Sequence, residues 1–107
     1  MLNLDKLKEI ANNDPALLSE LLTIFFQTTR EDMENLQTAI EQGHISQIPK
    51  IAHHIKGGAA IVGAQALCQI AEAMEQLGSD AHKNQYKGLI NDIQSQFNTI
   101  EALYPDF

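Results

Sequence analysis

Hydrophobic residues recur every three or four positions along most of the chain, the spacing that places them on one face of an α-helix. Strict alternation of apolar and polar residues, which is typical of strands, occurs nowhere at useful length. The sequence has no internal repeat and no low-complexity tract, and its Gly and Pro residues fall where helices could begin or end. The pattern therefore predicts an all-α protein with short connections.

Two helices are predicted in the first part of the chain, a short one from about Leu4 to Ala11 and a long one that begins at Asp14-Pro15. The Asp14 side chain can accept hydrogen bonds from free backbone N–H groups, and Pro15 suits the first helical position. Gly43 offers a C-terminal stop for the long helix. The apolar positions of the short helix are Leu4, Leu7 and Ile10 or Ala11, and those of the long helix are Leu18, Leu21, Leu22, Phe25, Thr29, Met33, Leu36 and Ile40.

Three more helices are predicted in the second part of the chain. The third begins near Ser46, a candidate cap that places Pro49 in the first turn, where its missing N–H costs little. The fourth ends at Gly78, and the fifth ends just before Pro105. Their apolar positions are, in order, Ile48, Ala52, Ile55, Ala59 and Val62; Leu67, Ile70, Ala71, Met74 and Leu77; and Tyr86, Leu89, Ile90, Ile93, Phe97, Ile100 and Leu103.

Four long amphipathic helices with short connections predict an antiparallel four-helix bundle, with the short additional N-terminal helix packed across one end. A chain of 107 residues is long enough for one hydrophobic core and too short for two. Residues 1–107 are therefore expected to form a single domain, and a monomer is the expected state because one bundle core accounts for the apolar stripes.

Charge and composition narrow the choice of partner. Seven basic and 14 acidic residues give a formal net charge of -7, which disfavours nucleic acid and anionic membranes and favours a protein partner. No apolar run is long enough to cross a bilayer, and the N-terminus lacks a secretory pattern, so a cytoplasmic location is expected. The one cysteine, Cys68, is interpreted as a buried small hydrophobe.

Candidate chemistry is concentrated in the third helix. At about 100° per residue, His53 points roughly 140° away from the direction of the apolar stripe, so solvent should reach its ring. Lys56, Gly57 and Ala60 lie on the same side, at i+3, i+4 and i+7. A neutral imidazole is a competent nucleophile near pH 7, and a nearby cation can offset the charge of an incoming phosphoryl group. This arrangement favours phosphoryl transfer.

Two adjacent glycines and a second histidine accompany this site. Each glycine inside a helix costs about 0.5 to 1 kcal/mol relative to alanine, so Gly57 and Gly58 suggest that another protein's backbone approaches the ring closely. His54 is the competing phosphoacceptor, but it faces Lys50 and Gly58 on the other flank and has no lysine at i+3. His53 is therefore the preferred acceptor.

The run His53-x-Ile55-Lys56-Gly57, followed by small residues and Gly63-Ala64, resembles the signature of histidine-containing phosphotransfer (HPt) domains. The resemblance extends over nearly the whole chain. Its other elements, in order, are Leu4-x-x-Leu7, Asp14-Pro15-x-Leu17-Leu18, a helix that carries phenylalanine, Leu67-Cys68 and a long final helix.

The resemblance implies a phosphorelay intermediate of two-component signalling, with His53 as phosphoacceptor, Lys56 as stabiliser of the phosphoryl charge and Gly57 as the residue that gives a partner access. It implies no enzymatic activity and no bound cofactor, since Mg²⁺ and the catalytic carboxylates belong to the partner receiver domain. The implied partners are response-regulator receiver domains and a sensor (hybrid) histidine kinase. The sequence departs from the family pattern at His54 and at Ala71-Glu72, where a larger aliphatic residue often precedes the glutamate.

Other interpretations remain open from the sequence. Phe26, one step off the stripe that contains Phe25, is a candidate docking anchor for a receiver, and burial in the core is an equally good interpretation. A non-phosphorylated helical adaptor domain that binds signalling proteins would require the grouping of histidine, lysine and glycine to be coincidental. A metal- or haem-binding bundle is disfavoured, because its histidines lack i, i+3 or i+4 spacing on one helix. Those histidines are His44, His53, His54 and His82.

Overall fold

The computed structural model describes residues 2–77 and 83–104, which are helical almost throughout and contain no strand. The elements, in order, are α1 (Asp5–Ile10), α2 (Pro15–Gln42), the 3-10 helix η1 (Ile45–Gln47), α3 (Ile48–Ile61), α4 (Gln65–Gln76) and α5 (Lys83–Leu103).

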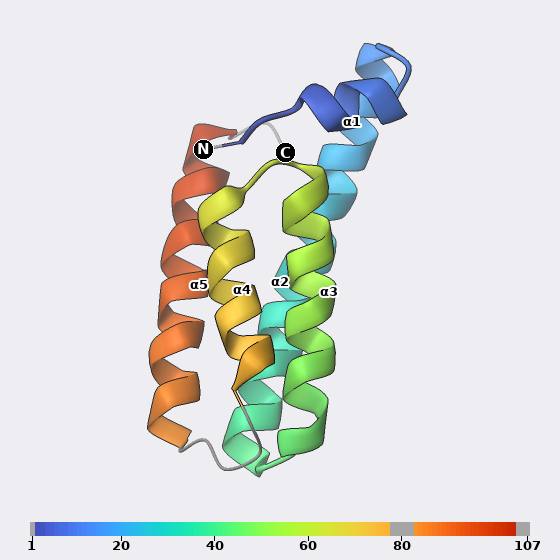
Figure 1. Ribbon diagram of the computed structural model, residues 1–107. Helices are drawn as coiled ribbons and strands as arrows, with labels where there is room; N and C mark the ends of the chain where they lie inside the picture. The colour runs from blue at the N-terminus through green and yellow to red at the C-terminus, as the bar shows by residue number, and fades with distance from the viewer. Residues whose placement is uncertain (1, 78–82, 105–107) are drawn as a thin grey trace.

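Helices α2 to α5 run alternately up and down along one long axis, while α1 lies across the end of the bundle at which α2 begins (Figure 1). α3 packs against α2 and α4, and α5 packs against the same two helices. The molecule measures 45 × 22 × 18 Å, as expected for one elongated bundle. The predicted antiparallel four-helix bundle with a short N-terminal helix is therefore confirmed.

The ends of α2 follow the sequence prediction, whereas the start of α3 does not. The Asp14 carboxylate accepts hydrogen bonds from the backbone N–H groups of Ala16 and Leu17, and Gly43 closes the helix with a φ of 72°. Ser46 is not a cap: it lies within η1, and α3 begins two residues later without a side-chain cap. The 3-10 turn leads directly into α3, so no separate cap is formed.

The predicted apolar stripes form one core, with most positions below a tenth exposed and the rest partly buried against it. One stripe position, Leu103, differs from the prediction, and of the two alternatives Ile10 and Ala11 it is Ala11 that joins the core. Ile10 is 54% exposed while Ala11 is buried, and Leu103 is 52% exposed. Both exposed residues end a helix, where fewer neighbours cover the stripe. α4 ends at Gln76 and α5 at Leu103, close to the predicted ends, whereas the stop residues Gly78 and Pro105, and also His82, lie outside the described residues.

Phe26 belongs to the core, so the docking-anchor prediction is wrong. Its side chain is 1% exposed and makes edge-to-face contacts with Phe25 and Phe97. α2 packs between α3 and α5, so its buried face is wider than one stripe and both phenylalanines point inward. A receiver cannot reach Phe26 on the folded bundle.

Candidate functional site

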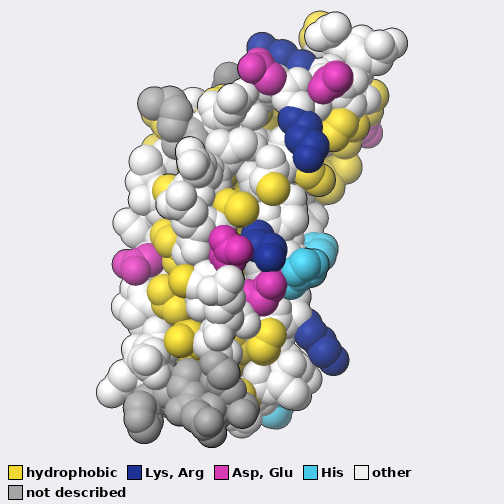
Figure 2. Space-filling model, viewed as in Figure 1, with side chains coloured by type: hydrophobic (Ala, Val, Ile, Leu, Met, Phe, Trp, Pro, Cys, Tyr) yellow, Lys and Arg dark blue, Asp and Glu magenta, His cyan; other side chains and the backbone are white. Residues whose placement is uncertain are grey.

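His53 projects from the solvent side of α3. Ala52 and Ile55, the neighbouring stripe residues, are 0% and 1% exposed, whereas the His53 side chain is 70% exposed. The helical geometry therefore places the ring as predicted. Figure 2 shows histidine, basic and acidic side chains grouped on the face over α3 and α4.

The basic and acidic partners of His53 form a three-residue cluster with it. Glu75, near the end of α4, places Oε2 2.8 Å from His53 Nδ1 and accepts a hydrogen bond at Oε1 from Lys56 Nζ at 3.0 Å. Because a carboxylate only accepts hydrogen bonds, a neutral His53 ring carries its proton on Nδ1. In that tautomer the lone pair resides on Nε2.

The Lys56–Glu75 ion pair fixes the charges beside the imidazole. The hydrogen bond to Glu75 raises the pKa of Lys56, and the hydrogen bond from Lys56, with a smaller contribution from His53, lowers the pKa of Glu75. Both groups are therefore charged throughout the neutral range. The Lys56 side chain is only 25% exposed, and its ammonium is held in place by Glu75.

The two glycines of the signature differ in their surroundings. A Cβ added at Gly57 would meet nothing within 4 Å, so this position leaves open space beside the exposed ring. A Cβ at Gly58 would lie 3.6 Å from Phe25 Cδ1, which is ordinary contact with α2. The inference that a missing side chain gives access from solvent therefore applies to Gly57 and not to Gly58.

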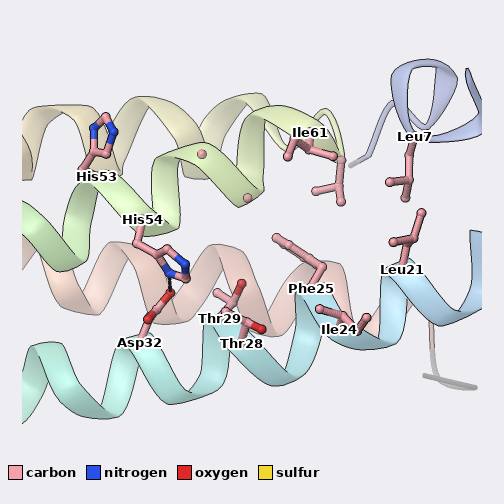
Figure 3. Close-up of a pocket in the computed structure, with 13 residues that line it drawn as sticks. Leu7, Leu21, Ile24, Phe25, Thr28, Thr29, Asp32, His53, His54 and Ile61 are labelled. Atoms are coloured by element: carbon pink, nitrogen blue, oxygen red, sulfur yellow. Dashed lines mark hydrogen bonds and ion pairs between the residues drawn. The ribbon is translucent and has the colours of Figure 1, made fainter. Parts of the chain in front are cut away.

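His54 has its own carboxylate partner on a different helix. Its Nδ1 lies 2.5 Å from Oδ2 of Asp32, which is on α2, and its side chain is 61% exposed (Figure 3). Across residues 2–77 and 83–104, no lysine or arginine forms an ion pair with Asp32. The two adjacent histidines thus point to opposite neighbours, and only one of them shares its carboxylate with a cation.

An apolar groove of about 460 Å³ lies between α2 and α3, next to both histidines. The Asp32–His54 pair closes one end of the groove, and Leu7 of α1 lies at the other (Figure 3). Ile24 and Ile61 on its rim are 51% and 39% exposed, so they add apolar surface at the mouth of the groove. The groove lining also includes Leu21, Phe25, Thr28, Thr29, His53, Gly57, Gly58 and Val62.

Other candidate chemistry is not assembled in the described part of the chain. No three His, Cys, Asp or Glu side chains gather there in a way that could hold a metal ion. Cys68 is only partly buried, contrary to the sequence interpretation, and packs at the edge of the core. None of the described helices combines the length and apolar character needed to cross a membrane.

An exposed imidazole with one ring nitrogen held by a carboxylate, on an antiparallel helical bundle, is an arrangement that suits a histidine phosphocarrier. The chain belongs to the Hpt domain family, whose model matches residues 20–103. This family membership confirms the resemblance found in the sequence.

Relatives and a solved structure are consistent with this assignment. The virulence sensor protein BvgS of Bordetella parapertussis is 30% identical over 87% of the chain, and that of Bordetella bronchiseptica is 28% identical over the same share. The chain spans 8% of the length of these relatives. The fold matches the crystal structure of histidine-containing phosphotransfer protein B (HptB) from Pseudomonas aeruginosa PAO1, with a TM-score of 0.86 and 21% identity, over 98% of this chain and 91% of the other.

Proposed function

We propose that His53 accepts a phosphoryl group from the aspartyl phosphate of a receiver domain and passes it to the receiver of a response regulator. A sensor hybrid histidine kinase supplies the phosphoryl group upstream. The observation that carries this proposal is the His53 ring, which is largely exposed and has Nδ1 held by Glu75. Nε2 is thereby left free to attack.

The proposed transfer needs no proton acceptor. The Nε2 lone pair attacks phosphorus, an N–P bond forms, and the P–O bond breaks with its electron pair going to the receiver aspartate. Nδ1 keeps its proton, so the phosphorylated ring is cationic and the Glu75 carboxylate stabilises it. Transfer to the second receiver reverses these steps, with Nε2 as the leaving atom.

Lys56 and Gly57 are assigned supporting roles. The Lys56 ammonium, held beside the ring by Glu75, offsets the negative charge of the phosphoryl oxygens. Gly57 leaves space for the receiver's backbone, because no atom occupies the position of a side chain there. The open groove beside His53 accommodates apolar side chains of the docked receiver.

We assign catalysis to the partner rather than to this chain. Residues 1–107 act as one phosphocarrier unit, which binds no cofactor of its own, while Mg²⁺ belongs to the receiver. A monomer meets this need, since one bundle carries the whole cluster around His53. A cytoplasmic location remains a prediction from the sequence.

The test is phosphotransfer from a phosphorylated receiver to wild type, His53→Ala and His44→Ala proteins, followed by detection of acid-labile, base-stable phosphate. His44 is the matched control because it is exposed and lies at the start of η1, away from the cluster. We expect label on wild type and His44→Ala and none on His53→Ala. Equal label on His53→Ala would refute the assigned site, and an unlabelled wild type across a panel of receivers would favour the adaptor interpretation.

A further inference from the structure

His54 occupies a defined place at the polar end of the groove. Its ring is 61% exposed, whereas the Asp32 side chain behind it is 15% exposed. A partner that fills the groove therefore meets the imidazole, while the carboxylate stays largely covered. Figure 3 shows the His54 ring turned from α3 toward Asp32 on α2, and away from His53.

The Asp32 contact limits the orientations of this ring. Nδ1 is occupied by the carboxylate at 2.5 Å, and Nε2 forms no hydrogen bond with any residue that the structure describes. A free histidine side chain on a helix samples several rotamers, and a fixed one loses less entropy when it binds. The pair thus presents one preoriented hydrogen-bonding atom beside an apolar surface.

Phosphoryl chemistry is a poorer use for this ring than for His53. A phosphoryl group on His54 would approach the Asp32 carboxylate, whose charge no lysine or arginine offsets within the described residues. At His53 the corresponding carboxylate is paired with Lys56. The uncompensated charge of Asp32 therefore opposes phosphorylation of His54, and recognition is the role that this geometry suits.

We propose that His54 is a specificity-determining contact for the receiver and that Asp32 is its positioning residue. The receiver places apolar side chains along the groove and a polar group against Nε2 of His54. This contact discriminates between receivers. A receiver without a polar group at that point removes the His54 imidazole from water without giving Nε2 a hydrogen-bond partner, so it binds more weakly. This inference rests on the proposed function, since it requires receivers to dock beside His53.

The test compares two phosphodonors. Transfer from a phosphorylated receiver depends on docking, whereas labelling by phosphoramidate does not. We expect His54→Ala and Asp32→Ala each to raise the KM for the cognate receiver by about tenfold, with kcat and phosphoramidate labelling unchanged. The preference for cognate over non-cognate receivers should fall by a similar factor.

Three variants test whether Asp32 acts by positioning the His54 ring or only by stabilising the fold. Asp32→Asn retains an oxygen that can accept from Nδ1–H and should recover most of the lost KM. The double variant of His54→Ala with Asp32→Ala should cost no more than either change alone, because the two residues act as a unit. Asp92→Ala removes an exposed carboxylate from α5 and should change nothing. Thermal unfolding confirms that each variant is folded.

The possible results distinguish this inference from the proposed function. Unchanged KM in both single variants would overturn the docking role while leaving the role of His53 intact. A fall in phosphoramidate labelling would also overturn it, because His54 would then act in the chemistry. If no receiver labels the wild type, the proposed function fails and the docking role fails with it.

Discussion

The adjacent histidines of α3 form a natural comparison. Each ring is largely exposed, and each has Nδ1 within 2.8 Å of a carboxylate from a neighbouring helix. The two carboxylates differ in their second partner. Glu75 also forms an ion pair with Lys56, whereas Asp32 forms none with a lysine or arginine in the described part of the chain. A carboxylate contacts Nδ1 in both cases, so under the proposed function the cation is the feature that distinguishes the two rings as phosphoryl acceptors.

The largest expected effect comes from removing the ring whose carboxylate is paired with lysine. In His53→Ala, we predict complete loss of label from a phosphorylated receiver, although His54 remains in place. His54→Ala should still reach the wild-type extent of labelling at saturating receiver. Peptide mapping of the labelled histidine is the measurement. Substantial label on His54 in the His53→Ala protein would remove the distinction between the two rings.

The next largest effect tests the cation itself. Lys56→Ala should slow transfer from the receiver by roughly tenfold, because Glu75 then faces the phosphoryl group with its charge uncompensated, as Asp32 does at the other ring. Adding Glu75→Gln should restore part of the rate. Single-turnover phosphotransfer measures both, with Lys50→Ala as an exposed-lysine control on the same helix. If the double variant is slower than Lys56→Ala, the hydrogen bond from Nδ1–H to Glu75 speeds transfer more than the repulsion between Glu75 and the phosphoryl group slows it.

A smaller effect is expected at Gly57, where stability and function should change in opposite directions. Gly57→Ala should raise the free energy of unfolding by about 0.5 to 1 kcal/mol, since alanine is the better helix former and its Cβ meets no atom. Transfer from the receiver should nevertheless slow by a few-fold, while phosphoramidate labelling stays the same. Gly88→Ala in α5, also in open space, should be stabilising alone. Unaltered receiver transfer in Gly57→Ala would contradict the access role.

The smallest effect concerns the pH dependence of stability. The pKa of Glu75 is lowered from 4.5 and that of Lys56 is raised from 10.5 by their mutual hydrogen bond. The Glu75 contribution is therefore present above pH 4.5 and lost as pH falls through its lower folded value, and the Lys56 contribution is lost only as pH rises beyond 10.5. Urea unfolding of wild type and Glu75→Gln should differ at pH 7 and converge toward pH 3. A constant difference would indicate that the pair does not titrate with folding.

The sequence predicted the bundle because helical periodicity is a local property of the chain. The same periodicity located His53 on the solvent side, since its angle from the Ala52 and Ile55 stripe depends only on helix geometry. The signature residues were found for the same reason, as they lie within one turn of the ring. Features confined to a single helix were therefore accessible without a structure.

Features that depend on how two helices pack against each other could not be predicted from the sequence. Glu75 and Asp32 each lie 22 positions from the histidine they contact, and the register between helices is set by packing rather than by spacing along the chain. The sequence left Phe26 undecided between core and surface for a related reason, because the burial of α2 on both flanks depends on where α3 and α5 pack. Predicting Glu75 and Asp32 as the partners of the two histidines would have required knowledge of the register between the helices.

In the proposed function, Glu75 holds the proton on Nδ1 of His53 and leaves Nε2 as the phosphoryl-accepting atom. Nitrogen NMR of ¹⁵N-histidine-labelled protein, recorded before and after phosphorylation by a receiver, observes both ring nitrogens directly. The account predicts an N–P bond at Nε2 of His53, a proton retained on Nδ1 of that ring, and no N–P bond at His54. Phosphorus on Nδ1 of His53, or on either nitrogen of His54, would contradict it.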